Sequence, residues 1–452
     1  MQNSHFHKRE IFIFCSPDKS RVLKTIKRTS PPELPNLSSD KTIQIQQMEV
    51  EVTMYIRQKP LFSFDTLMQY QPKTRLAMVF ESIDLHPLLK TLPIKSIRGP
   101  KGYSSAALIK AFLAMRLCSI PTVTLLVERL KTDLVFRYEC GFSLEQPVPS
   151  LATFSRFFQK IAETDSLQVL FSALVDTAIQ DKVISGEVVA IDASAIDSYE
   201  KPVPKKELNS NGDSATWGAK LDTHGNQHVW FGYKLHLAVD TKSELPIAVK
   251  VTPANRNDVT QAIPLMDEIK HQPKYYCMDM GYDAKDVYQA AYERQAQAII
   301  PLNRRKEKLP PEGMDENRTP TCSMGYPMVY WGCEREKGIL KFRCPHVCGK
   351  VNCPNGSAWC SPSNYGLVIK KKVEDDPRSF CTPHRGTREW EKLYAERTSV
   401  ERAFSRLKEQ LGANTVRVQG IKKVTAHLML CCIALLAGTI AVNRQIHQQK
   451  AA

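Results

Sequence analysis

The chain has 452 residues, of which 42% are hydrophobic and 24% charged, and its 62 Lys and Arg exceed its 47 Asp and Glu to give a formal net charge of +15. This composition excludes a wholly disordered chain, a collagen-like fibre and a small disulfide scaffold, and the length predicts about two to four domains. The excess of positive charge favours a polyanionic partner, with nucleic acid first, but a solvated basic surface would have the same composition.

The N-terminal third divides into an arm and a helical region. Residues 1–60 are polar, with Pro and Ser but no sustained period, and we expect a loose, partly disordered arm. Residues 61–180 have helical apolar spacing, and Ser150 is a suitable N-cap for a helix over 151–161. Short helices joined by tight turns fit a DNA-binding helix-turn-helix domain, and they fit a small helical bundle equally well.

The pattern changes to strands near residue 187. Apolar runs predict strands at 188–191, 230–240, 245–251, 275–278 and 298–302, with helices over 259–269 and 286–296. Three strands in succession followed by strand–helix–strand predict a mixed α/β sheet, which we assign to a domain over 181–305.

The C-terminal part begins with an irregular cysteine-bearing region at 306–387. It continues with a helix over 388–410 and an apolar helix from 424, which we group as a domain over 388–445 before a tail at 446–452. The apolar run 428–442 is about 15 residues, shorter than the roughly 20 of a membrane helix, so it predicts a buried core helix. With no secretory signal visible, we expect a cytoplasmic protein of the bacterial, nucleoid-associated type and no membrane partner.

Two carboxylates follow apolar strand runs directly. Asp192 ends the first run and Asp279 ends the fourth, and strand ends at the rim of an α/β sheet are where ligands usually bind. A carboxylate there is costly when desolvated alone but is a good ligand for a hard cation. Taken singly, each residue is explained better as a strand-capping Asp that starts a turn.

A third acid lies on the helix over 388–410. Arg397, Glu401 and Lys408 are four and seven residues apart and so share one helical face, and Tyr394 precedes Arg397 by three residues. This face directs one acid and two cations to the same place. By spacing alone, a surface ladder of ion pairs explains it at least as well.

Together these residues resemble an insertion-sequence DDE transposase of the branch with the Y-x2-R-x3-E-x6-K signature. Tyr394, Arg397, Glu401 and Lys408 match all four positions and all three gaps. The segments 232–236 (GYKLH), 252–255 (TPAN) and 278–283 (MDMGYD) are also similar to family motifs, and so is the helical region before them. Met280 departs from the family, which has a basic or polar residue there.

The resemblance implies an RNase H-like core of the retroviral integrase superfamily, with a helical N-terminal domain and a cysteine-rich insertion before the last catalytic helix. Asp192, Asp279 and Glu401 would then be the catalytic triad and would bind Mg²⁺ or Mn²⁺, since carboxylates suit a hard cation. The partners implied are double-stranded DNA, both the terminal inverted repeats of the element and the target, and a second copy of the chain in a paired-end homodimer.

The resemblance also assigns DNA-binding roles. Arg397 and Lys408 would clamp phosphates, and Lys234 is a further DNA-binding candidate. Tyr394 would stack on a base or donate to a phosphate, although a packed core tyrosine is nearly as good an interpretation. Two alternative functions remain: a metal-dependent nuclease on the same fold, and an inert transposase-derived protein that binds DNA sequence-specifically.

Other polar residues in these segments have simpler explanations. Asp240 begins a polar turn, and Asp283 is expected to cap the following helix. His236 shares a strand face with Lys234, so both could point toward the active cleft, but a single strand histidine is more often a core residue.

The cysteines form a second group. Seven of the 13 cysteines lie between residues 322 and 381, and in a chain without an export signal such a cluster suggests metal before disulfides. The spacing contains no clean C-x2-C pair, so structural Zn²⁺ is only a modest favourite over free thiols. The predicted zinc ligands are Cys322, Cys344, Cys348 and Cys353.

Overall fold

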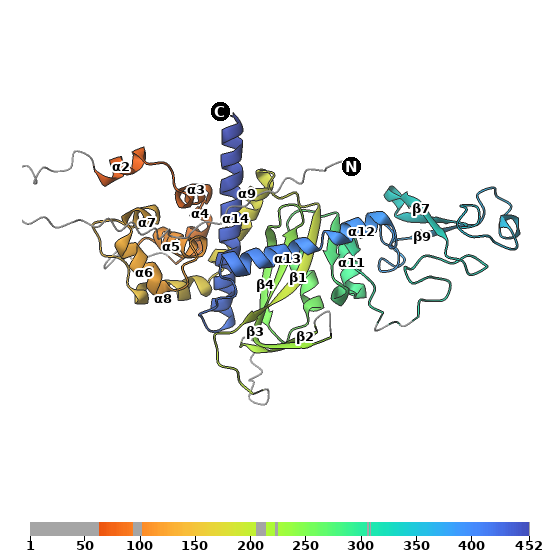
Figure 1. Cartoon of the computed structure of the whole chain (residues 1–452), viewed down its shortest axis with the longest axis horizontal. Helices are drawn as coiled ribbons and strands as arrows, with labels where there is room; N and C mark the ends of the chain where they lie inside the picture. The colour runs from red at the N-terminus through yellow and green to blue at the C-terminus, as the bar shows by residue number, and fades with distance from the viewer. Residues whose placement is uncertain are drawn as a thin grey trace, which may run out of the picture. The chain divides into compact units, whose positions relative to one another are not determined.

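The computed structural model describes residues 63–93, 102–204, 214–221, 225–304, 307 and 309–451, and the predicted arm at 1–60 lies outside them. The chain divides into two compact units, 1–74 and 75–452. The described part of the first unit contains helix α2 (Phe64–Tyr70), which is capped by the Ser63 hydroxyl. All other described elements belong to the second unit (Figure 1).

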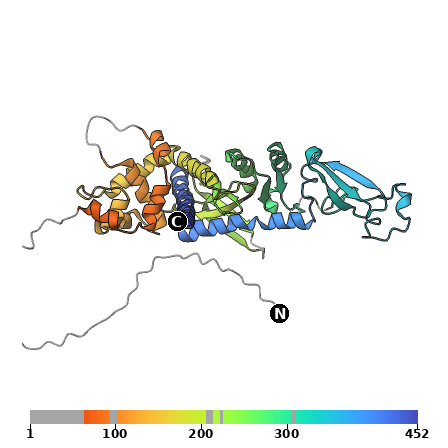
Figure 2. The same ribbon diagram turned by 90° about the horizontal axis from the view of Figure 1, so that it is seen from above.

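Most of the short helices of the second unit lie on one side of its long C-terminal helix, and the sheet lies on the other, as Figure 2 shows. Side-chain oxygens of Ser104, Thr122 and Ser150 cap three of these helices, and the Ser150 cap confirms the sequence prediction. The bundle contains α3 (Arg75–Ser82), α4 (His86–Thr91), α5 (Ser105–Leu117), α6 (Val123–Thr132), α7 (Leu134–Glu139), α8 (Leu151–Ala162) and α9 (Ser166–Gln180).

The predicted mixed α/β sheet is confirmed, with six strands. Its path is β2-β3-β1-β5-β6, and β4 pairs with the second half of the long strand β3. β1 is antiparallel to β3 and parallel to β5, which is in turn parallel to β6. The strands are β1 (Val188–Asp197), β2 (Thr216–Leu221), β3 (Gln227–Asp240), β4 (Pro246–Pro253), β5 (Tyr275–Met278) and β6 (Gln297–Ile299).

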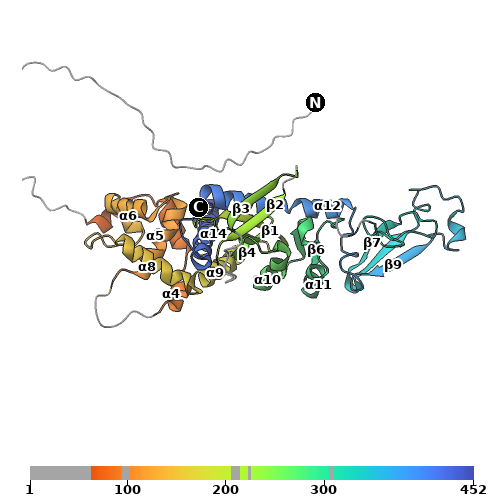
Figure 3. The same ribbon diagram turned by 90° about the horizontal axis from the view of Figure 1, so that it is seen from below.

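Short helices connect these strands and cover the sheet (Figure 3). Two of them, η2 (Asp258–Gln261) and α10 (Ala262–Glu268), lie between β4 and β5, and η3 (Met280–Tyr282) and α11 (Lys285–Glu293) lie between β5 and β6. Strand β2 was not predicted, because its single apolar alternation is too short to stand out from the polar loop before it.

The cysteine-bearing region at 306–387, which follows β6, was expected to be irregular, and this expectation is wrong. It contains a three-stranded antiparallel sheet of β7 (Val329–Glu334), β8 (Ile339–Arg343) and β9 (Val368–Lys372). Lysines and arginines interrupt the apolar residues of β8 and β9, which hides the strand signal in the sequence. One face of the sheet packs into a separate apolar cluster of Met328, Leu340, Phe342, Val373 and Phe380.

The predicted helix over 388–410 is divided into three parts: α12 (Arg388–Ala395), α13 (Thr398–Ser405) and the π-helical turn η6 (Arg406–Gln410). The last helix, α14 (Ile421–Ala451), packs against α3, α5, α8, α9 and β4. By length and composition residues 421–450 would suffice to cross a membrane, but most of their apolar window is buried in the protein. The helix therefore has the packing of the predicted core helix.

Three buried histidines make the fold sensitive to acid. Burial lowers the pKa of His236 and His384 to about 4 and that of His427 to about 3, whereas an unfolded histidine titrates near pH ~6.5. The unfolded chain therefore binds protons first. This contribution to stability is complete above pH ~6.5 and is lost as the pH falls toward 4, by roughly 1.4 kcal/mol per pH unit for each histidine.

We expect the thermal unfolding temperature to fall between pH 6.5 and 4.5 and to fall less steeply in His236→Gln, which retains a polar group for Thr252. Calorimetry over this range checks the expectation, with His86→Gln at an exposed position as the control. An unchanged slope in His236→Gln would contradict it.

Candidate active site

Asp192 and Asp279 lie side by side where β5 separates from β1. Ile191 pairs with Met278 in the last register of the two parallel strands, and each aspartate is the next residue in its chain. Asp279 continues the extended backbone of β5 as the cap of η3. Because side chains alternate along a strand, the two carboxylates project from the same face of the sheet.

The first predicted strand does not end on Asp192, and this prediction is wrong. Strand β1 continues to Asp197 because β3 pairs with it along its whole length, while β5 supports only residues up to Ile191. Asp192 is thus a mid-strand residue with an open edge on one side. This edge is the rim at which the sequence placed the site.

The two aspartates differ in their surroundings. Asp192 is 8% exposed, and burial raises the pKa of its carboxyl to about 6, with Asp279 adding to the rise and Lys220 and Arg397 opposing it. Its Oδ1 accepts the Ala193 N–H at 2.7 Å. The Oδ1 of Asp279 accepts the Gly281 N–H at 2.8 Å.

Helix α13 brings the third acid to this face of the sheet. Its apolar side, with Val400, Ala403 and Phe404 buried, packs on β1 and β3. The guanidinium of Arg397 bridges the two elements: Nη1 lies 3.5 Å from Asp192 Oδ2, and Nη2 donates to Glu401 Oε1 at 2.7 Å. Asp192 and Glu401 therefore share one cation, although they are far apart in the sequence.

The other two residues of the signature are Tyr394, which precedes Arg397 in the chain, and Lys408, which follows Glu401. Lys408 reaches β1, where Nζ donates to Ser194 Oγ and to the Ala195 carbonyl, each at 2.8 Å. Tyr394 stacks on Trp390, with ring centroids 5.2 Å apart and planes inclined by 16°, and burial raises the pKa of its half-buried hydroxyl. This packing favours the core interpretation of Tyr394.

Lys234 and His236 are not brought to the acids. They pair with Ala195 and Ala193 of β1, whose side chains alternate with that of Asp192, so they lie on the opposite face of the sheet. The expectation that both could point toward the acids is therefore wrong. Lys234 donates to Asp258 at 2.7 Å, and the fully buried His236 bonds Thr252 at 2.8 Å, which agrees with its predicted structural role.

Two other aspartates have structural roles. Asp240 stabilises the turn after β3, where its Oδ2 accepts the backbone N–H and the hydroxyl of Ser243. Asp283 does not cap α11, because Ala284 occupies the N-cap position, so the capping prediction is wrong. Its side chain, 1% exposed, instead receives two hydrogen bonds from Arg378, at 2.8 and 2.7 Å.

We expect Asp283→Asn to destabilise the protein by roughly 2 kcal/mol, because it removes the bidentate partner of the largely buried Arg378 and leaves Glu307 as the remaining described carboxylate partner. Denaturant unfolding measures this loss. Asp286→Asn, an exposed position in the next helix, should change stability little. Equal stability of the two variants would show that the Asp283–Arg378 pair contributes nothing.

Sequence reasoning did not select Tyr282, which is 2% exposed. Burial raises the pKa of its hydroxyl well above the usual range, and the charges of Asp192, Asp258 and Asp279 raise it further. Its oxygen has no hydrogen-bond partner among the described residues. Tyr282 lies directly before Asp283 in the segment 278–283 (MDMGYD), which is similar to a family motif, and this position is the signal that could have indicated it.

The donor set of this site is suited to a divalent cation. Three carboxylates and no soft ligand point to a hard metal ion, and a cation would compensate the repulsion between Asp192 and Asp279. Within the described parts of the chain, no three His, Cys, Asp or Glu side chains are already grouped as ligands of one ion. The Arg397 guanidinium, which touches two of the three acids, contributes positive charge at this place.

The predicted zinc site is not seen among the described residues. Cys322 packs against the apolar cluster of the three-stranded sheet, as does Cys333. Cys344 and Cys348 belong to one backbone turn, and the Cys353 N–H donates to His346 Nδ1. All 12 cysteines in the described ranges have free thiols.

Comparison with known proteins gives family matches over most of the chain. Residues 185–437, more than half of the sequence, match the transposase DDE domain. Residues 65–160 match the transposase domain DUF772.

Two individual proteins are also similar. The transposase for insertion sequence element IS402 of Burkholderia cepacia is 31% identical over 103 residues, which are 20% of this chain and 48% of the relative, so the chain spans about half the length of that relative. The structure of a piggyBac transposase synaptic complex with hairpin DNA aligns at 10% identity with a TM-score of 0.36, over 83% of this chain and 75% of that chain.

Proposed function

The chain belongs to the transposase DDE domain family, and from this premise we propose that it is a DNA transposase that cleaves the ends of an insertion sequence and joins them to target DNA. The observation that carries the proposal is the meeting of Asp192 and Asp279 at one edge of the sheet, with Glu401 tied to Asp192 through Arg397. These are the three acids of the proposed catalytic triad.

The strand connections support an RNase H-like core. Four antiparallel strands, β1 to β4, come first in the chain, and the parallel strands β5 and β6 extend the other side of β1. The helix that bears Glu401 packs on β1 and β3. In this proposal the segment between β6 and α12 is an insertion that separates Glu401 from the two aspartates without disturbing the sheet.

The family implies a divalent metal, and we propose that it is Mg²⁺, with Mn²⁺ as a substitute, held by Asp192, Asp279 and Glu401. The metal would stabilise negative charge on the attacking and leaving oxygens of the phosphodiester. Asp192 and Asp279 would hold it against the sheet, and Glu401, the most exposed of the three acids, would close the site from α13.

The cations next to the acids would position the DNA. Arg397 has the bidentate geometry that suits a phosphate, and Lys408, fixed on Ser194, keeps a positive charge beside β1. Lys234 pairs with Asp258 on the other face of the sheet, so its position does not support the DNA-binding role expected for it. The proposed DNA ligands are the terminal inverted repeats of the element and a target duplex, and a homodimer would hold two ends together.

The experiment that tests the proposal combines purified protein with element-end DNA, a second duplex and Mg²⁺, and it follows both cleavage and joining. A transposase gives both products and requires the metal. Cleavage without joining favours a metal-dependent nuclease, and binding without either product favours an inert DNA-binding descendant. The presence of all three acids favours catalysis over the inert alternative.

A further inference from the structure

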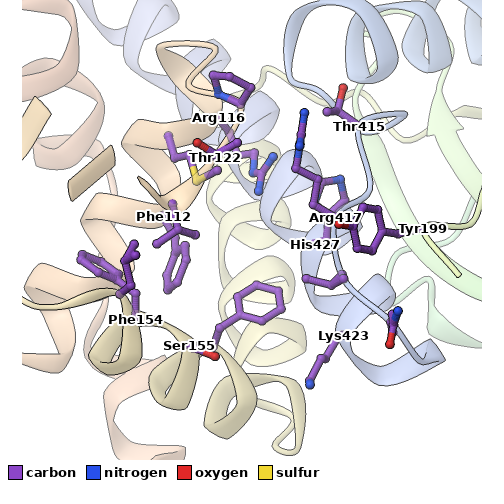
Figure 4. Close-up of a pocket in the computed structure, with 17 residues that line it drawn as sticks. Phe112, Arg116, Thr122, Phe154, Ser155, Tyr199, Thr415, Arg417, Lys423 and His427 are labelled. Atoms are coloured by element: carbon purple, nitrogen blue, oxygen red, sulfur yellow. The ribbon is translucent and has the colours of Figure 1, made fainter. Parts of the chain in front are cut away.

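A second site lies in the unit formed by residues 75–452, where the helical bundle faces the C-terminal segment. It is a cavity of about 510 Å³. One wall comes from α5, α6 and α8, and the other comes from residues 415–427 together with Tyr199 (Figure 4). None of its lining residues belongs to the proposed catalytic triad or to its signature.

The charged residues that line this cavity are all positive. Arg116 of α5, Arg417 of the connecting segment and Lys423 of α14 line it, and its lining includes no Asp or Glu. No ion pair with a described carboxylate involves any of these three cations. The described lining of the cavity therefore carries positive charge and no carboxylate, although Glu200, next to Tyr199, accepts the Gly420 N–H nearby.

Arg116 makes this arrangement unusual. It is only 8% exposed, and its Nε has no hydrogen-bond partner among the described residues. Buried charges in proteins are normally paired and hydrogen-bonded, because removing an ion from water without compensation is costly. The nearby His427 supplies no counter-charge, because an imidazole is neutral or cationic, and its Nε2 donates to the Gly412 carbonyl. A bound anion would supply the missing counter-charge.

The rest of the lining is apolar and aromatic. Phe112, Phe154 and Phe158 form one side, with Phe112 and Phe154 in edge-to-face contact at 5.5 Å between ring centroids. Tyr199 is 57% exposed and leaves a ring accessible at the mouth. A cavity of this size accepts a ligand with an anionic end and a flat or apolar body.

We propose that this cavity binds one nucleotide unit of a DNA strand, with its phosphate on Arg116, Arg417 and Lys423 and its sugar and base against the aromatic side. The inference rests on the proposed function, because DNA is the phosphate-bearing substrate of that function. It adds a second DNA contact, away from the acids, at the junction of the helical bundle and the core.

The test measures the affinity of the full chain for a labelled element-end duplex by fluorescence anisotropy at several salt concentrations. The variants are Arg116→Gln and the double variant Arg417→Gln/Lys423→Gln. The control is Lys422→Gln/Lys450→Gln, which removes two exposed charges from α14 at positions that do not line the cavity. Thermal unfolding shows whether each variant is folded.

We expect the double variant to bind DNA at least about ten-fold more weakly and to lower the salt slope of log K by about 0.9 for each lost phosphate contact. The control should retain the wild-type slope. Wild-type slope and affinity in the double variant, whose residues are partly accessible, would overturn the inference even if Arg116→Gln fails to fold.

A separate experiment distinguishes a DNA strand from a free anion as the source of the phosphate that binds in the cavity. Inorganic phosphate and deoxyadenosine monophosphate are each tested for thermal stabilisation of the wild type and of the double variant. Stabilisation by inorganic phosphate, combined with unchanged DNA binding in the double variant, would overturn the proposal. If the wild type binds no DNA at all, the proposed function fails and not merely the cavity assignment.

Discussion

Asp279→Asn is expected to abolish strand cleavage, with a rate loss of about 10⁴-fold, while the affinity for element-end DNA stays within about two-fold. The substitution keeps the shape of the side chain, and an amide can still accept the Gly281 N–H. It removes the charge that faces Asp192 across the end of β5. A site that holds a divalent cation between these carboxylates cannot retain it with one of them neutral.

The measurement is single-turnover cleavage of a labelled end duplex in Mg²⁺, with binding followed separately. Glu401→Gln should give the same loss, although Glu401 comes from a different element and is 122 residues away in the sequence (401 − 279). Asp286→Asn, seven residues beyond Asp279 and exposed on α11, is the matched control. Wild-type cleavage by either active-site variant would remove that acid from the proposed triad.

Arg397→Lys is expected to slow cleavage by about 10²- to 10³-fold, although it conserves the charge. The guanidinium contacts Asp192 with one nitrogen and Glu401 with the other. A lysine ammonium is a single point charge on a flexible stem and cannot contact both carboxylates as the two guanidinium nitrogens do. Glu401, which is 54% exposed, would then lose its only described link to β1.

Arg402→Lys provides the comparison for this prediction. Arg402 lies on the same helix and pairs with Glu244, away from the acids. Its replacement should leave the cleavage rate within about two-fold of wild type. If both lysine variants are equally active, the bridge formed by Arg397 has no role in catalysis.

Local periodicity was sufficient for the parts of the site that lie within single elements. The four-residue interval between Arg397 and Glu401 predicted a shared helical face, where the two residues form an ion pair, and the apolar run before Asp279 predicted the strand that ends there. These predictions succeeded because strand alternation and helical spacing depend only on neighbouring residues.

The failures at the site and at the cavity involve partners distant in the sequence. The face on which Lys234 lies depends on the register of β1 against β3, which no local pattern fixes. Asp283 looks like a helix cap until Arg378, 95 residues later, is brought to it. The cavity around Arg116 likewise requires α5 to meet a segment about 300 residues further along the chain.

The pair formed by Asp283 and Arg378 has a mechanical consequence. Arg378 belongs to the long excursion between β6 and α12, and Asp283 follows Asp279 by only four residues. The Asp283–Arg378 ion pair therefore attaches the excursion to the chain only four residues after Asp279. Glu307 and the Asn303 N–H also bond this pair and share any displacement of Arg378. The part that passes through Asp283 reaches Asp279 over only four residues of backbone, so movement of the excursion is coupled to the position of the Asp279 carboxylate.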